Sequence, residues 1–349
     1  MADSTSSNWL DGLKSDQSAD LAAGLFGFNP PLEETNLILL PVEWAATRLY
    51  GKGACHAPKA ILKASHQLNF YDPGLGEMVV HGIAMSESHP EIQVLNQEAS
   101  RLVTNIWEGS SKADQKEEWT KEVNKLSKQV NKMVYEQAKS YIAQNKFVGV
   151  VGGDHSSPYG LLKALAEKHK EFTILHIDAH FNLRKKYEGF TWSHRSIMYN
   201  VLKHIPQVKR ICHVGVRDFC AQEKEFSDTD DRSIAYTARE LFHKEISGDL
   251  KDVFTSLINS LSNEIYVSFD ICGLDPFLCP STGLPVPGGL RYCDAAYLLE
   301  EIALRGKKII GFDLCEVSPG SEWDAQVGAR VLYKLCSALL YSQFHSTTL

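Results

Sequence analysis

The chain has 349 residues, of which 44% are hydrophobic and 23% charged, a composition typical of a globular protein with a sizeable core. Its formal net charge of -7 is spread along the chain, which argues against nucleic acid as the main partner. Residues 1–11 are polar and acidic, with neither a basic start nor an apolar run, so we expect a cytoplasmic protein without a secretory signal or a membrane anchor.

Residues 1–35 show little periodicity and end in Asn29-Pro30-Pro31. They are predicted to form an N-terminal extension with one short helix around Leu10 to Leu13. From residue 36 onward, apolar runs alternate with amphipathic stretches, and no repeat or change of composition marks a second domain. We therefore predict a single domain over 36–349. The eight cysteines lack paired C-x-x-C spacing, so most of them are predicted to be free, buried thiols, with Cys272 as the exception.

Six short runs are apolar along their whole length rather than alternating. This pattern is typical of strands that are covered on both faces. The amphipathic stretches between them predict helical crossovers, which join parallel strands. We therefore predict a three-layer α/β/α sandwich with a mostly parallel central sheet. The predicted strands are Leu37–Val42, Phe147–Val151, Thr173–Asp178, Arg210–Val216, Glu264–Asp270 and Lys308–Asp313.

Two stretches show the apolar spacing of amphipathic helices. Within Glu117–Gln144, apolar residues recur every three or four positions among Lys, Glu and Gln, which predicts a long helix with a solvated charged face. The same spacing within Trp323–Phe344 predicts a second helix with a buried face.

Polar residues directly follow four of the predicted strands. In an open parallel sheet, ligands bind beyond the carboxyl ends of the strands. Each segment alone has an ordinary explanation as a turn or a cap. Their occurrence together favours a shared site. The segments are Gly152–Ser156, Asp178–Asn182, Asp270–Pro276 and Asp313–Pro319.

The motifs in these segments, G-G-D-H-S, D-A-H-x-x, S-F-D-x-x-x-x-D-P and E-V-x-P, resemble the signature set of the arginase, agmatinase and formimidoylglutamase superfamily, the ureohydrolases. Gly53–Ile61 is similar to the early G-x-x-x-x-P-x-A-I stretch of that family. Tyr187–Phe190 and Gly311–Glu316 look nearest to a bacterial agmatinase-like branch. The resemblance implies an arginase-like fold and a hydrolase that cleaves a C–N bond of a guanidino or amidino compound, releasing urea or an equivalent amide.

The resemblance also implies a binuclear site in which two Mn²⁺ ions share a nucleophilic hydroxide. Metals about 3.5 to 4 Å apart lower the pKa of bound water, and carboxylate and imidazole ligands suit Mn²⁺. Asp178 and Asp270 are implied to bridge the two ions. The implied ligands of one ion are His155, Asp178, Asn182 and Asp270, and those of the other are Asp178, His180, Asp270 and Cys272.

Three further residues are assigned roles by the resemblance. Glu316 is implied to face the guanidinium-like end of the substrate. His194 is implied to line the pocket and move protons. Asp275 is implied to bind substrate or to orient neighbouring groups. Together with Asp178, Glu316 and His194 are the implied catalytic residues.

Two of the implied ligands depart from the family pattern, which has Asp at positions 182 and 272. Asn182 still offers a neutral carbonyl oxygen. Cys272 is a soft ligand that must lose a proton to bind, and it prefers Zn²⁺ or another thiophilic ion. We therefore expect reduced Mn²⁺ affinity, most of all at Cys272, and we expect that restoring Asp at both positions would raise it.

Three interpretations follow from this sequence. The first is an active hydrolase, with its metal preference altered. The second is a catalytically weak or inactive relative with a degenerate metal site that acts as a binding or assembly protein, because fold does not imply function. The third is an α/β protein whose His and Asp residues only cap helices and strand ends.

The remaining features concern the substrate tail and the assembly. Trp44, Arg48 and Tyr50 follow the first strand, where a loop can reach that tail. The basic triplet 184–186 is either an attractant for an acidic tail or an exposed turn. The Gly- and Pro-rich segment 280–289 is predicted to be a loop beside the site or a rigid turn. Relatives form trimers or hexamers, so we expect a homo-oligomer.

Overall fold

A computed structural model describes residues 9–10, 23–48, 52–109 and 112–345 of the protein. Its eight strands form one sheet in the order β2-β1-β3-β8-β7-β4-β5-β6, and every pairing is parallel. The predicted α/β/α class is confirmed, with a sheet that is wholly parallel. The strands are β1 Leu37–Val42, β2 Ile83–Met85, β3 Phe147–Gly152, β4 Phe172–Ile177, β5 Val208–Val214, β6 Ser233–Tyr236, β7 Glu264–Asp270 and β8 Lys308–Cys315.

All six predicted strands are present, with ends that differ by at most two residues. The two strands that the sequence did not predict, β2 and β6, lie at the edges of the sheet. They span only three and four residues, and most of their side chains are only partly buried. A search for long, fully apolar runs misses such strands because an edge strand needs less apolar covering.

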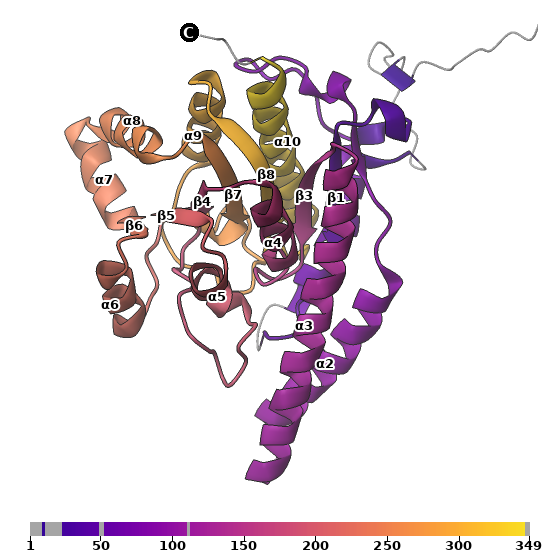
Figure 1. The fold of residues 1–349 in the computed structure, drawn as a ribbon. Coiled ribbons are helices and arrows are strands. Elements are labelled where there is room, and N and C mark those ends of the chain that lie inside the picture. The colour runs from indigo at the N-terminus through magenta and orange to yellow at the C-terminus, as the bar shows by residue number, and fades with distance from the viewer. Residues whose placement is uncertain (1–8, 11–22, 49–51, 110–111, 346–349) are drawn as a thin grey trace, which may run out of the picture.

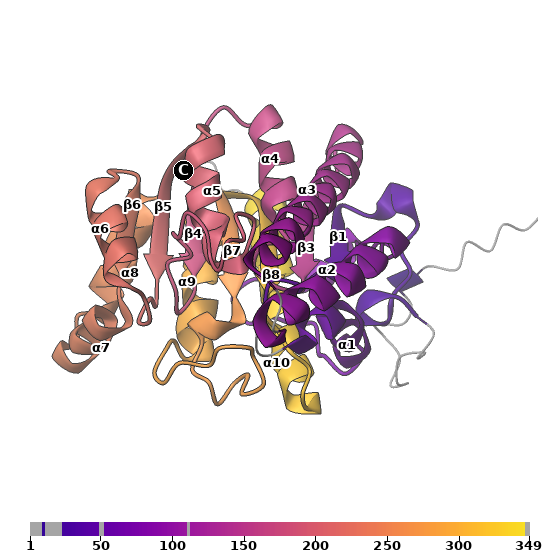
Figure 2. The same cartoon turned by 90° about the horizontal axis from the view of Figure 1, so that it is seen from below.

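Two hydrophobic layers enclose the sheet, as alternate side chains of one strand illustrate. Leu37 and Leu39 of β1 point into one layer, whereas Ile38 and Leu40 point into the other. Helices α1, α8, α9 and α10 cover the first face, and α2 to α5 cover the second (Figure 2). The helices are α1 Ala57–Ser65, α2 Pro90–Glu108, α3 Ala113–Ala143, α4 Tyr159–Lys168, α5 Ile197–His204, α6 Ala221–Thr229, α7 Ala238–Ser247, α8 Leu250–Ser260, α9 Tyr292–Leu304 and α10 Glu322–Phe344.

Both predicted helices are present, and α3, together with α2, forms a long pair that extends beyond the sheet (Figure 1). This projecting pair holds the loop before His194. Asn124 of α3 accepts hydrogen bonds from the backbone N–H and hydroxyl of Thr191 at 2.7 and 2.9 Å. Trp107 of α2 packs edge-on against Phe190. These contacts fix a loop that leads into the site.

The described part of the predicted N-terminal extension lies against the domain. Leu25, Phe26 and Phe28 are buried in the layer that contains α1 and α10, and the Phe26 N–H donates to Ser65 Oγ at 2.8 Å. Most of the short helix predicted around Leu10 falls at positions outside the described residues. Among the residues that are described, no helix has the length and apolar character needed to cross a membrane.

Candidate active site

Four neighbouring strands bring the implied site residues together. β3, β8, β7 and β4 lie side by side in that order, and all run in the same direction. Their carboxyl ends therefore meet at one edge of the sheet. His155, Glu316, Asp270 and Asp178 stand at or just beyond these four ends. The local sequence places them there because each strand stops where its apolar run gives way to polar residues.

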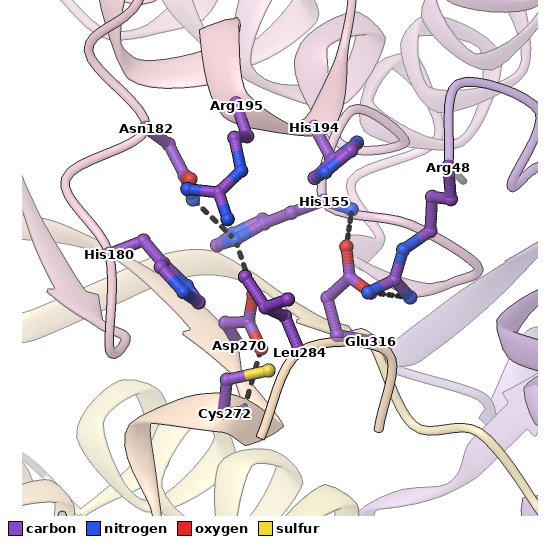
Figure 3. A pocket seen from close by; sticks show the side chains of 10 residues that line it. All are labelled: Arg48, His155, His180, Asn182, His194, Arg195, Asp270, Cys272, Leu284 and Glu316. Carbon is purple, nitrogen blue, oxygen red and sulfur yellow. Dashed lines mark hydrogen bonds and ion pairs between the residues drawn. The ribbon is translucent and has the colours of Figure 1, made fainter. Parts of the chain in front are cut away.

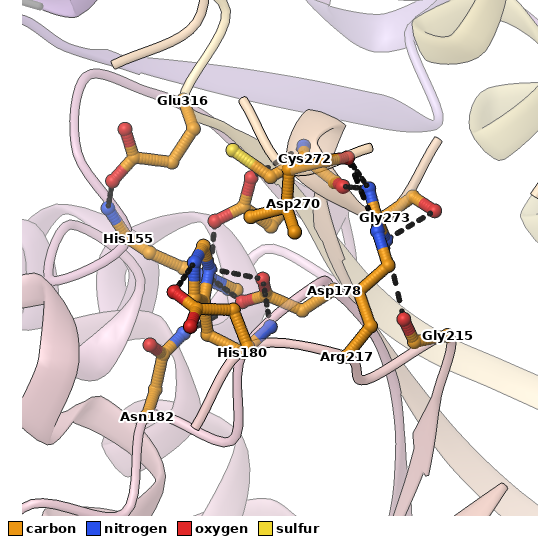
Figure 4. Close-up of polar contacts among 12 residues, drawn as sticks. His155, Asp178, His180, Asn182, Gly215, Arg217, Asp270, Cys272, Gly273 and Glu316 are labelled. Atoms are coloured by element: carbon orange, nitrogen blue, oxygen red, sulfur yellow. Dashed lines mark hydrogen bonds and ion pairs between the residues drawn. The ribbon is translucent and has the colours of Figure 1, made fainter. Parts of the chain in front are cut away.

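Asp178 is the centre of the polar network (Figure 4). Its Oδ2 accepts from Asn182 Nδ2 at 2.6 Å and lies 3.2 Å from His155 Nδ1. Its Oδ1 accepts from the His180 N–H at 2.9 Å and lies 3.1 Å from His180 Nδ1. Burial raises the pKa of Asp178, but His155, His176 and His180 outweigh it, so the pKa lies well below its usual value. Asp178 is a fully buried carboxylate that stays charged.

His155 has its two ring nitrogens in different surroundings. Nε2 lies 2.8 Å from Ser268 Oγ, while Nδ1 lies 3.3 Å from Asp270 Oδ2 and faces the site. Burial lowers the pKa of His155, but Asp178, Asp270 and Asp313 together raise it well above its usual value. Because Nε2 contacts Ser268, His155 would hold a cation through Nδ1.

Asn182 and Glu316 both adopt left-handed backbone conformations, with φ of 56° and 69°. Such angles are uncommon for residues other than glycine and cluster at functional sites. Each is held by its surroundings. The Asn182 carbonyl accepts from the Met198 N–H at 3.1 Å, and the Glu316 N–H donates to the Gly153 carbonyl at 2.8 Å. Both side chains are thereby aimed into the site.

Cys272 lies beside the site in a short 3₁₀ helix, Ile271–Gly273. Its N–H donates to Asp270 Oδ1 at 2.7 Å, and its Sγ lies 3.1 Å from Thr282 Oγ1. Burial, together with the charges of Asp270 and Glu316, raises the pKa of the Cys272 thiol well above its usual value. In the metal-free protein the thiol is therefore protonated and hydrogen-bonded, and it would have to lose its proton to bind a metal.

The two implied metal-ligand sets fit an ion differently. In the first set, His155 Nδ1, Asp178 Oδ2 and Asn182 Nδ2 lie within 3.3 Å of one another in pairs, and Asp270 Oδ2 lies 3.3 Å from His155 Nδ1. Donor atoms of His155, His176 and Asp178 also form a possible His/Asp metal group, within 4.8 Å of one another. The imidazole and carboxylate donors suit a divalent cation, whereas Asn182 presents its amide N–H group here and would bind a cation only with its carbonyl oxygen turned inward. The second set includes Cys272 and fits poorly.

A small pocket opens beside this cluster (Figure 3), with a cavity of about 10 Å³, room for about one water molecule. Arg48 and Glu316 form a buried ion pair on one side of it. Arg195 lines the pocket and lies over the Tyr187 ring, 5.5 Å from its centre. The lining residues are Arg48, His155, His180, Asn182, His194, Arg195, Asp270, Cys272, Leu284 and Glu316.

The remaining sequence-derived candidates occupy different places. His194 lines the pocket, and its Nδ1 lies 3.3 Å from Thr47 Oγ1. Burial, with the charges of Arg48 and Arg195, lowers the pKa of His194 well below its usual value, so its imidazole is neutral. Asp275 does not line this pocket. Its Oδ1 accepts from the Phe277 N–H at 3.0 Å and caps a turn. Tyr50 lies outside the described residues.

Three contributors to the site were not predicted from the sequence. His176 lies 3.1 Å from Asp178 Oδ2, and its position two residues before Asp178, on the same face of a strand, was a usable signal. For Arg195, the usable signal was its position directly after the predicted His194. No sequence pattern indicated Arg217, because it donates to backbone carbonyls: that of Cys272 at 2.9 Å (Figure 4) and that of Val286 at 2.8 Å.

Comparison with known proteins gives the family. The arginase family model matches residues 35–341. The chain belongs to the arginase family. It is 30% identical to N(1)-aminopropylagmatine ureohydrolase of Thermus thermophilus over 304 residues, which is 86% of this chain and 89% of the relative. The predicted superfamily and its agmatinase-like relatives are thus confirmed.

Solved structures of this family share the fold. The agmatine ureohydrolase of Thermoplasma volcanium matches with a TM-score of 0.68 and 19% identity, covering 91% of this chain and 94% of that one. Proclavaminate amidino hydrolase of Streptomyces clavuligerus matches with a TM-score of 0.67 and 18% identity, covering 95% of this chain and 99% of that one. At these identities, the likeness supports the arginase-like fold.

Proposed function

We propose that this arginase-family protein is a hydrolase that cleaves a C–N bond of a guanidino or amidino compound with the help of a divalent metal. One observation carries the proposal: a ring nitrogen of His155 and carboxylate oxygens of Asp178 and Asp270 converge at the carboxyl edge of the sheet, with the Asn182 amide beside them. Relatives that are named ureohydrolases add support. Hydrolysis adds the hydroxyl of water to the guanidino carbon and a proton to the leaving amine.

His155, Asp178 and Asp270 would hold a divalent ion, with Asn182 joining them through its carbonyl oxygen, and Mn²⁺ is our first candidate and Zn²⁺ our second. Such an ion would lower the pKa of a water molecule and polarise the substrate. Asp178 and Asp270 would offset its charge. We expect a second ion to bind weakly, because its implied set depends on Cys272, whose thiol is directed to Thr282. A single well-held ion is therefore the form that we propose.

Two residues of the pocket are suited to bind the cationic group of the substrate and to transfer protons. Burial raises the pKa of Glu316 to about 8, although Arg48 lowers it. A cationic substrate end in the place of Arg48 would likewise favour the carboxylate and would bind it by charge-assisted hydrogen bonds. His194 lines the pocket and would accept a proton from water and pass it to the leaving amine. Its lowered pKa keeps the imidazole neutral before the reaction but also makes it a weak base. We assign His194 and Glu316 these roles as proposals, with Asp178 as the central ligand.

A weakly active or inactive relative is the second candidate, and two observations favour it. Cys272 replaces a carboxylate and stays protonated, and Arg48 already neutralises Glu316. Such a protein would keep the fold as a binding or assembly component. The cytoplasmic location, the absence of nucleic-acid and membrane partners, and a trimeric or hexameric assembly stay predictions.

Release of urea, or of formamide in the case of formimidoylglutamate, separates the two candidates. Purified protein is loaded with Mn²⁺ or with Zn²⁺ and assayed with agmatine, arginine, guanidine, formimidoylglutamate and other guanidino acids. The hydrolase proposal predicts that at least one compound is cleaved and that EDTA and the His194→Ala substitution each abolish the reaction. Metal-loaded, folded protein that cleaves none of them would establish the second candidate instead.

A further inference from the structure

The side of the pocket formed by Glu316 already holds a guanidinium group, that of Arg48. The two side chains form an ion pair, and only 4% and 2% of their respective surfaces are exposed. Burial lowers the pKa of Arg48, but Glu316 and neighbouring acids raise it above its usual value, so this guanidinium is charged. The pocket therefore binds a guanidinium supplied by its own chain.

Glu316 is held rigidly for this contact. Its Oε1 accepts from the His155 N–H at 3.0 Å, and its carbonyl accepts from Thr282 Oγ1 at 2.8 Å. With the left-handed backbone already described, these bonds leave Oε2 facing Arg48. A carboxylate fixed on one side and open on the other is suited to bind a planar cation.

Gly283 completes the space for the guanidinium. A Cβ added at this position would overlap Nη2, Cζ and Nη1 of Arg48, so a side chain there would exclude the group. The φ angle of Gly283 lies outside the left-handed region, so the backbone alone does not demand glycine here. The close approach of Arg48 gives a physical reason for glycine at this position.

We propose that Arg48 is an internal occupant of a guanidinium subsite formed by Glu316 and Gly283, and that a guanidino ligand must displace it to bind. This inference rests on the proposed function for the nature of that ligand. An occupant present nine-tenths of the time raises the apparent dissociation constant about tenfold. Wild-type protein is therefore self-inhibited toward guanidino compounds.

The test measures binding of guanidinium ion, at concentrations below those that unfold the protein, by titration calorimetry in EDTA. Arg48→Ala should bind guanidinium at least about tenfold more tightly than the wild type. Arg195→Ala is the matched control, because it removes the same charge from the same pocket without freeing Glu316. Ammonium ion serves as the control ligand, and the Arg48→Ala substitution should raise its affinity much less than that of guanidinium.

Two more variants make the outcome decisive. Arg48→Gln removes the charged guanidinium but keeps a polar side chain of intermediate length, so it should reproduce the gain, and it decides the matter if Arg48→Ala does not fold. Adding Glu316→Gln to Arg48→Ala should remove the gain in guanidinium affinity. An unchanged affinity in Arg48→Ala, or an equal gain in Arg195→Ala, would overturn the proposal.

The same data separate this inference from the hydrolase proposal. Tighter guanidinium binding in Arg48→Ala without urea release by any variant would uphold the internal occupant and reject the hydrolase. Urea release by the wild type, with no gain in guanidinium affinity in Arg48→Ala, would uphold the hydrolase and reject the internal occupant.

Discussion

Replacing Asn182 with Asp tests whether the site is adapted to be stable without a full set of carboxylates. The Asn182 side chain is 3% exposed, and its Nδ2 donates to Asp178 Oδ2 at 2.6 Å. A hydrogen bond to a charged acceptor contributes about 1.5–3 kcal/mol. In Asn182→Asp, a carboxylate oxygen replaces this donor and repels Asp178, while the nearby His155 offsets part of that repulsion. We expect the metal-free variant to lose about 3 kcal/mol of unfolding free energy.

Metal should reverse this loss. An ion held at 100 times its dissociation constant stabilises the folded state by about 2.7 kcal/mol, and the added carboxylate should strengthen its binding. We therefore expect Mn²⁺ to stabilise Asn182→Asp more than it stabilises the wild type. The measurement is urea-induced unfolding followed by circular dichroism, in EDTA and in Mn²⁺.

Asn200→Asp is the matched control for this pair of measurements. Asn200 is 5% exposed, and its Nδ2 donates to the Thr191 carbonyl at 2.8 Å, away from the carboxylate cluster. Its replacement should destabilise the protein to the same extent in EDTA and in Mn²⁺. Equal stability of Asn182→Asp and the wild type in EDTA, or an equal effect of Mn²⁺ on both Asp variants, would refute the reasoning.

Three further predictions concern the second ligand set, the loop beside it and a buried ion pair. Cys272→Asp should raise the Mn²⁺ content per chain in elemental analysis, whereas Cys272→Ser should not, and equal contents would contradict the poor fit of this set. Arg217→Ala should lower the unfolding free energy by about 2–4 kcal/mol and speed proteolysis of the 280–289 segment, and unchanged proteolysis would show that the contacts of Arg217 with backbone carbonyls are dispensable. The Nζ of Lys334 lies 2.7 Å from Asp72 Oδ2. Replacing Lys334 with Ala should lower the unfolding free energy by about 3 kcal/mol. The Mn²⁺ content of that variant should stay unchanged, and a loss of metal would link the two regions.

Strong local patterns made the central sheet predictable. The fully apolar run Leu37–Val42 was predicted with its exact bounds because both faces of β1 are covered. The edge strand Ser233–Tyr236 was missed because its outer side chains stay partly exposed. The nearness of His155, Asp178 and Asp270 followed from the rule that parallel strands end at one edge.

The parts of the site that escaped prediction depend on contacts distant in sequence. Arg48 was expected only to reach a substrate tail, whereas it pairs with Glu316 across 268 positions of the chain. No local pattern encodes such a pairing. Asp275 belongs to a family motif, yet its side chain caps a turn outside the pocket. A motif identifies a segment, but the direction of each side chain depends on the tertiary structure.

The most direct test of the central claim is the metal content of the purified protein after Mn²⁺ loading and removal of excess ion. The claim is that His155, Asp178, Asn182 and Asp270 hold a divalent ion at the carboxyl edge of the sheet. We predict about one Mn²⁺ per chain in the wild type and almost none in His155→Ala. No bound Mn²⁺ in the wild type, or the same content in both proteins, would contradict the claim.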